Sequence, residues 1–273
     1  MLISQVERAV DELGLAGQDV CVHGSMRAFG EKIGADAVLD AFLGQDCTVM
    51  VPAFSYRYEV RPVPEYMPDI NGAGNNYAYF LNREYEDLPP YDVLSREIST
   101  EDMGVFAERV LFHAESVRGN HPLNSFAAVG RNAAQLVAGQ RPMALYDPFR
   151  RLCAGGGYVL MMGTDLTSAT IIHYAEQLAG RSPFIRWAKD ALGKTMPVQA
   201  GGCSRGFGQL EEILAPLARR TQVGKSLWTC YPAREMAEAC ANAIKRKNEI
   251  TRCNVPGCSR CRDALLGGPK GEW

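Results

Sequence analysis

The alternation of short apolar segments with amphipathic ones restricts the fold of this chain more than any other feature. Strand-like apolar segments lie at 19–25, 47–54, 124–130, 158–163, 195–202 and 226–233. Between them, apolar residues recur at helical spacing. We expect helices over 2–14, 35–43, 103–112, 131–138, 168–179, 206–219 and 232–246. This order is typical of an α/β protein, in which helices cover a central sheet.

The chain of 273 residues shows no internal repeat, low-complexity segment or clear linker. We therefore predict a single α/β domain over 1–250, with a central mixed sheet flanked by helices. A small Cys-rich tail over 251–273 is expected to pack onto it. Residues 54–98 have little periodicity, and an insert of that length is usually a lid or a binding loop.

The composition excludes several functional classes. Apolar residues make up 47% and charged residues 22%, as in ordinary globular proteins. The net charge of −2 does not favour binding to nucleic acid or to an anionic membrane. No apolar run approaches the roughly 20 residues that cross a bilayer, and the first residues lack a signal-peptide pattern. Since the nine Cys do not form a disulfide-framework pattern either, we expect a cytoplasmic protein without membrane or nucleic-acid partners.

One predicted helix, over 168–179, carries His173 and Glu176 in its apolar sequence. Residues three apart lie side by side on a helix, and Thr167 or Ser168 is a suitable N-cap. Two interpretations stay open from this segment alone. The pair is either a partly buried histidine satisfied by a carboxylate, or a general base whose tautomer the carboxylate fixes.

Two further segments each follow or begin a predicted strand: VHGSMRAFG at 22–30 and HPLNSFAAVG at 121–130. Exposed backbone N–H groups at the first strand end would suit the pantetheine or phosphate of a nucleotide-like ligand. Without a nucleotide-binding glycine pattern, an ordinary turn is the better explanation of either segment by itself.

Taken together, these segments resemble the aminoglycoside 3-N-acetyltransferase family. The blocks VHGSMRAFG, VPAFSY, MGVFAERV, HPLNSFAAVG, YVLMMG and TIIHYAEQ occur in the family's order and spacing. The resemblance implies an antibiotic N-acetyltransferase type of α/β fold, unlike the common acetyltransferase fold. It also implies transfer of acetyl from acetyl-CoA to an amine of a 2-deoxystreptamine antibiotic, normally the 3-amino group.

The resemblance implies roles for individual residues. His173 corresponds to the catalytic base and Glu176 to its orienting carboxylate. The residues that would contact acetyl-CoA are Ser25, Met26, Arg27, Phe29, Gly30 and Ser125. The chain departs from the family at Gly24 and Asn120, where Ser is usual. Neither departure removes a catalytic group, but both leave the acceptor open.

The second half of the 54–98 insert is acidic. A polycationic aminoglycoside needs anionic walls, and we expect this stretch to supply them. The candidate substrate-binding residues are Glu84, Glu86, Asp87 and Asp92. A solvated acidic loop without a ligand is the alternative.

The cysteines near the C-terminus predict a metal site. Cys253, Cys258 and Cys261 lie within nine residues, and Cys203 offers a fourth thiol after a Gly-Gly pair. Four such ligands fit a tetrahedral Zn²⁺ site, and with no open position the metal would be structural. Reduced thiols in a surface tail are the alternative.

The leading hypothesis is therefore an acetyl-CoA-dependent N-acetyltransferase that uses a general base and direct transfer. The acceptor is alternatively another amino sugar or a biosynthetic amine. Basic residues around the cysteines also suggest a zinc-knuckle nucleic-acid binder, although few aromatics are interleaved with them. A cysteine nucleophile would instead give a two-step transfer. Resistance or biosynthesis as the role, and the oligomeric state, a homo-oligomer included, stay open.

Overall fold

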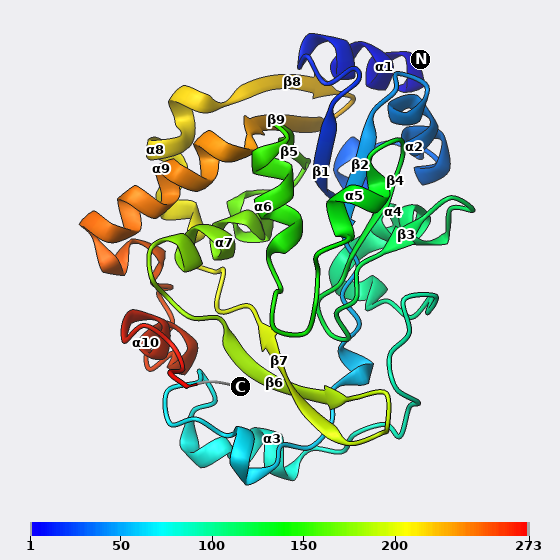
Figure 1. Cartoon of the computed structure of the whole chain (residues 1–273). Coiled ribbons are helices and arrows are strands. Elements are labelled where there is room, and N and C mark those ends of the chain that lie inside the picture. The colour runs from blue at the N-terminus through cyan, green and yellow to red at the C-terminus, as the bar shows by residue number, and fades with distance from the viewer. Residues whose placement is uncertain (1, 272–273) are drawn as a thin grey trace.

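A seven-stranded mixed sheet forms the centre of the protein in the computed structural model, which describes residues 2–271 (Figure 1). The strand order is β3-β4-β2-β1-β5-β9-β8. Strand β1 pairs in parallel with β2 and with β5, and the outer pairs are antiparallel. The strands are β1 (Asp19–Gly24), β2 (Thr48–Pro52), β3 (Val117–Arg118), β4 (Phe126–Val129), β5 (Tyr158–Met162), β8 (Arg219–Val223) and β9 (Ser226–Pro232). The predicted α/β class and mixed sheet are confirmed.

Helices cover both faces of this sheet because its strand residues are apolar on alternate sides. Val20 and Val22 pack with α1, α2 and α4, whereas Cys21 between them packs with α5, α6, α7 and α9. The helices are α1 (Leu2–Glu12), α2 (Ala35–Leu43), α3 (Ala78–Asn82), α4 (Thr100–Phe112), α5 (Ala133–Val137), α6 (Asp147–Ala154), α7 (Ile171–Leu178), α8 (Glu211–Leu214), α9 (Ala233–Arg246) and α10 (Ser259–Leu265). Within residues 2–271, no helix is long and apolar enough to cross a membrane.

A second layer lies beyond the carboxyl ends of β1 and β2 and frames the functional site. It consists of the hairpin β6 (Phe184–Lys189) and β7 (Thr195–Ala200), with α3 and α10 nearby (Figure 1). The 54–98 insert is more ordered than its sequence indicates. Tyr77 and Phe80 pack on the fully buried Trp187 of β6, which fixes the insert to the hairpin.

Two local differences from the predicted helices have physical causes, and a third concerns strands. The expected helix over 206–219 is broken into short turns around α8, since Pro216 cannot donate a helical hydrogen bond. Helix α7 begins at Ile171 because Leu166–Ser168 form a separate 3-10 turn, whose Thr167 N–H donates to Asp165 Oδ1. Strands β3, β6 and β8 lie in segments where the periodicity predicted none.

Candidate active site and cysteine centre

A cavity of about 560 Å³ opens between the carboxyl ends of β1 and β2 and the second layer. His173 of α7 lines it, together with His23 and Gly24 at the end of β1. Residues from the end of β1, from α7 and from the 54–98 insert therefore line one cavity. The predicted general base therefore faces a cavity large enough for a small molecule.

The His173–Glu176 pair forms as the helical spacing predicts. The Nδ1–H group of His173 donates to Glu176 Oε2 at 2.7 Å, and each side chain is only 11% exposed. This bond places the proton on Nδ1 and leaves the Nε2 lone pair free. A ring held in this tautomer can accept a proton at Nε2.

Glu176 is itself held by two partners that the sequence did not indicate. Arg181 Nη1 donates to Glu176 Oε1 at 2.5 Å, and Thr251 Oγ1 donates to the same oxygen at 3.2 Å. Burial raises the pKa of Glu176, but the hydrogen bond from His173 and the charges of His173 and Arg181 outweigh it and lower the pKa overall. The carboxylate therefore stays ionised beside the imidazole.

Two aromatic rings and a glycine pair surround the imidazole of His173 on three sides. The Tyr146 ring lies parallel to the imidazole at 6.4 Å, and Phe207 meets it edge-on at 4.7 Å. On the third side lies the Gly201–Gly202 backbone. A Cβ atom on Gly201 would lie 3.3 Å from His173 Cδ2 and 3.5 Å from Nε2, so glycine leaves room at the reactive nitrogen.

The other buried histidines have different environments. Burial lowers the pKa of His23 to about 4 and that of His121 to about 3. His121 Nδ1 accepts from the backbone N–H of Asn124 at 2.9 Å, so this histidine stabilises a turn. The turn interpretation of the 121–130 segment is therefore the one that the structure supports.

The six residues expected to contact acetyl-CoA fall into two groups. Ser25, Met26 and Arg27 form the partly exposed turn that follows β1 and adjoins the cavity lining at Gly24. The side chains of Phe29 and Ser125 are fully buried. Phe29 packs on Trp228, Ser125 donates to Ala53 O, and Gly30 takes a left-handed φ of 72° to end the turn. The structure therefore places only the first group where a ligand can reach its side chains.

The four acidic residues predicted to bind substrate do not line the cavity. Glu86 pairs with Arg57, Asp87 pairs with Lys189, and Asp92 accepts from the N–H of Leu94. The insert instead contributes the aromatic residues Phe54, Tyr56, Tyr79 and Phe80, and the charged residues Glu59 and Arg83, to the lining.

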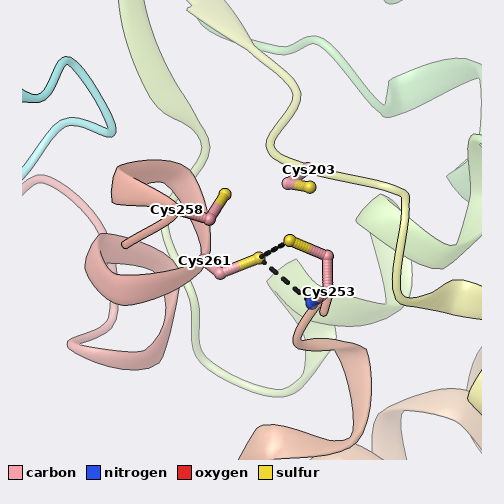
Figure 2. Close-up of side chains that lie close together, drawn as sticks. All are labelled: Cys203, Cys253, Cys258 and Cys261. Atoms are coloured by element: carbon pink, nitrogen blue, oxygen red, sulfur yellow. Dashed lines mark hydrogen bonds between the residues drawn. The ribbon is translucent and has the colours of Figure 1, made fainter. Parts of the chain in front are cut away.

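The predicted cysteine cluster assembles fully. The Sγ atoms of Cys203, Cys253, Cys258 and Cys261 lie within 4.8 Å of one another, and none of the four is in a disulfide (Figure 2). Tetrahedral Zn²⁺ with Zn–S bonds of about 2.3 Å needs sulfur separations of about 3.8 Å. The Cys253 and Cys261 sulfurs are 3.5 Å apart, so small shifts would admit the ion.

The C-terminal tail contacts the His173–Glu176 pair and contributes to the cavity lining. Cys203 directly follows Gly201 and Gly202, which lie beside the imidazole and leave space there. Thr251 reaches Glu176, and Arg260 of α10 lines the cavity. The sequence signalled only the glycine pair, because the other contacts join residues far apart in the chain.

Comparisons with known proteins agree with this architecture. The family model described as aminoglycoside 3-N-acetyltransferase matches residues 21–245. Aminoglycoside N(3)-acetyltransferase III of Pseudomonas aeruginosa is 32% identical over 63% of this chain and 62% of its own length. Aminoglycoside N(3)-acetyltransferase VIII of Streptomyces fradiae is 32% identical over 71% of this chain and 65% of its own. The chain thus matches a little under two thirds of each relative's length.

Solved structures of the same fold extend the match along the chain. Apo aminoglycoside acetyltransferase AAC(3)-IVa superposes with a TM-score of 0.76 at 21% identity, covering 97% of both chains. The binary complex of AAC-IIIb with CoASH gives a TM-score of 0.69 at 22% identity, covering 90% of this chain and 97% of the other. With the family model covering most of its length, this chain belongs to the aminoglycoside 3-N-acetyltransferase family.

Proposed function

We propose that the protein is an acetyl-CoA-dependent N-acetyltransferase that acetylates an amine by direct transfer. The observation that carries the proposal is the His173–Glu176 pair at the cavity wall. The names of its relatives, and the CoASH bound in a protein of the same fold, support the reaction and the donor.

In the proposed reaction, His173 acts at Nε2. The acceptor amine attacks the thioester carbonyl carbon as Nε2 takes its proton, so the N–C bond forms and the C–S bond breaks. The imidazolium then returns the proton to the departing CoA thiolate. Ionised Glu176 stabilises the transient positive charge, and general-base assistance of this kind contributes about 10²–10⁴ in rate.

A cysteine nucleophile has less support from the site. Cys21 Sγ lies 3.8 Å from His23 Nε2, but burial raises the pKa of the Cys21 thiol and lowers that of His23. Both shifts oppose formation of the thiolate–imidazolium pair that such a mechanism needs. Direct transfer with His173 as the base does not need this ion pair, and it is therefore the mechanism that we propose.

The donor is proposed to enter along the turn after β1, beside Ser25, Met26 and Arg27. Phe29 and Gly30 would shape the end of this turn, whereas Ser125 holds the segment after β2 through its bond to Ala53 O. A Cβ on Gly24 would lie 2.5 Å from Met162 Cε, so a larger residue here would require the end of the Met162 side chain to move. Because acetyl-CoA is the proposed donor, we keep the cytoplasm as the proposed location.

The names of the relatives are the first indication of the acceptor class. Their names make the 3-amino group of an aminoglycoside the primary candidate. Another amino sugar or a biosynthetic amine is the second, and one observation favours it: Glu86 and Asp87 are occupied by ion pairs outside the cavity.

The four-cysteine cluster is proposed to hold a structural Zn²⁺. Its thiolates would complete the coordination, so the metal would take no part in the chemistry. It would instead fix the loop at Gly201–Gly202 and the tail that carries Thr251. Binding energy at such a site acts as folding energy, since the unfolded chain has no preformed site.

Release of free CoA thiol tests the proposed reaction. Purified protein is mixed with acetyl-CoA and a panel of amines: a gentamicin-type and an apramycin-type aminoglycoside, and neutral and anionic amino sugars. Acceptor-dependent release with at least one amine is expected. Release that proceeds equally without any acceptor would indicate hydrolysis or a two-step transfer instead.

A further inference from the structure

We propose that one end of the cavity, formed by Arg83, Arg186 and Arg260, binds a carboxylate or phosphate group that the acceptor carries. We call these three residues the arginine end. This inference rests on the proposed acetyl transfer and selects the second of its two acceptor classes, an amino sugar or biosynthetic amine, in a form that also bears an anion. All three residues belong to the cavity lining that includes His173.

Arg186 is the fixed member of the arginine end. It is only 5% exposed, and its guanidinium lies 4.7 Å from the Phe80 ring. Its Nη1 donates to the backbone oxygens of Asn71 at 3.2 Å and Ile185 at 2.6 Å. Within residues 2–271 it forms no ion pair with a carboxylate, and Nε and Nη2 make no protein hydrogen bond. A buried charge with free donors at a cavity wall is a ready anion-binding group.

Arg260 lies on helix α10 of the C-terminal tail, which places it at the cavity. Helix α10 is tied to the insert by the buried Asp263, which accepts from the backbone N–H of Gly72 at 2.7 Å. The neighbouring Cys261 belongs to the cysteine centre. Arg260 itself is exposed and, in the described part of the chain, makes no ion pair. The four-cysteine cluster and Asp263 therefore fix the helix that carries Arg260, while its guanidinium stays unpaired among the described residues.

The carboxylates in the cavity lining do not neutralise the arginine end. Three guanidiniums face two carboxylates, Glu59 and Asp102. Glu59 is paired with Arg83 at 2.8 Å, and burial raises the pKa of Glu59 despite the nearby charges of all three arginines. A polycation would therefore meet excess positive charge here, whereas an oxyanion would find guanidinium groups as hydrogen-bond donors.

Two sources can supply an oxyanion: the acceptor itself and the phosphates of acetyl-CoA. The arginine end comes from the insert, β6 and α10, which lie away from the carboxyl end of β1 in Figure 1. The donor turn follows β1 directly. This separation assigns the arginine end to the acceptor.

The test compares amino sugars that share one ring: D-glucosamine, D-glucosamine 6-phosphate and muramic acid, which carries a carboxylate. Gentamicin is the polycationic reference. We expect kcat/KM for at least one anionic sugar to exceed that for D-glucosamine by 10-fold or more. Arg260→Gln should lower that kcat/KM by about 5- to 10-fold, somewhat below the effect of a buried charged hydrogen bond because Arg260 is exposed. The KM for acetyl-CoA should stay unchanged.

Arg252→Gln is the matched control. Arg252 is also exposed and also directly precedes a cluster cysteine, but it does not line the cavity. It should leave both kinetic constants unchanged. The inference is overturned if neither anionic sugar is preferred over D-glucosamine, or if gentamicin is the better acceptor. It is also overturned if Arg260→Gln raises the KM for acetyl-CoA, because the arginines would then bind the donor.

A binding measurement separates failure of this inference from failure of the proposed function. If no amine releases CoA, the proposed function fails, and titration calorimetry with inorganic phosphate still decides the anion site. Phosphate binding that weakens in Arg260→Gln but not in Arg252→Gln supports the arginine end. Equal binding in all three proteins, or none, rejects it.

Discussion

Replacing Glu176 by Gln should cost both turnover and stability, for a reason visible in its contacts. Each carboxylate oxygen has its own donors: Oε2 accepts from His173, and Oε1 accepts from Arg181 and Thr251. An amide has only one oxygen. Glutamine must therefore turn an NH₂ group toward either the imidazole or the guanidinium, and both already present an N–H.

The magnitudes follow from burial. Arg181 is 7% exposed, so removing the carboxylate leaves a buried charge without its partner, which costs about 3–5 kcal/mol of stability. Loss of the charged hydrogen bond to His173 costs roughly 1.5–3 kcal/mol in the transition state, or about 10- to 100-fold in kcat. The fall in kcat should be smaller than that for removal of the imidazole itself.

The contribution of Glu176 to the free energy of unfolding should depend on pH in a defined direction. The folded protein holds the pKa of Glu176 below its unfolded value. The carboxylate therefore stabilises the fold fully above the unfolded pKa of about 4.5, and this contribution is lost as pH falls through the lower folded value. The free energy of unfolding of the wild type should decline over that acidic range more steeply than that of Glu176→Gln.

Urea unfolding between pH 3.5 and 7, with CoA release near neutral pH, measures both effects. Glu249→Gln is the control, because Glu249 is a largely exposed carboxylate that pairs with Arg252. It should change stability by less than about 1 kcal/mol and leave kcat unaltered. Unchanged kcat together with unchanged stability in Glu176→Gln would refute the reasoning.

Three further predictions address the surrounding groups. Purified protein should contain close to one zinc per chain, and Cys258→Ser should lose the metal and lower the melting temperature; metal-free wild type of full stability would reject the zinc site. Gly201→Ala should lower kcat about 10-fold with less than about 1 kcal/mol of destabilisation, because its Cβ would crowd the His173 ring at 3.3 Å; unchanged kcat would show that this side of the ring is unused. The double variant Glu86→Gln, Asp87→Asn should change the KM for gentamicin by less than about twofold, since both acids are ion-paired outside the cavity; a large rise would restore them as substrate ligands.

Local patterns predicted those parts of the fold that depend on neighbouring residues. Strands β1, β2, β4, β5 and β9 of the sheet follow from short apolar runs, and the contact of His173 with Glu176 follows from helical spacing. The cysteine spacing likewise predicted a cluster, and its four sulfurs do converge. The strands and the His173–Glu176 pair depend on residues a few positions apart. The cysteine cluster was predictable because cysteines at such spacing commonly bind one metal ion.

The remaining parts of the site depend on tertiary packing. Thr251 lies 75 residues from Glu176 in the chain, and no local pattern marks it as a partner. Acidity alone indicated the insert carboxylates as ligands, but cations elsewhere in the fold bind Glu86 and Asp87. The arginine end combines three distant segments, so only their arrangement in space reveals it.

The most direct measurement of the central claim is the turnover of His173→Ala compared with its affinity for acetyl-CoA. If Nε2 removes the amine proton, kcat should fall by about 10²–10⁴. The Kd for acetyl-CoA, measured by calorimetry, should stay within about twofold of the wild type, since the base acts on the acceptor. A variant that folds normally and retains near-normal kcat would contradict the assignment of His173 as the base.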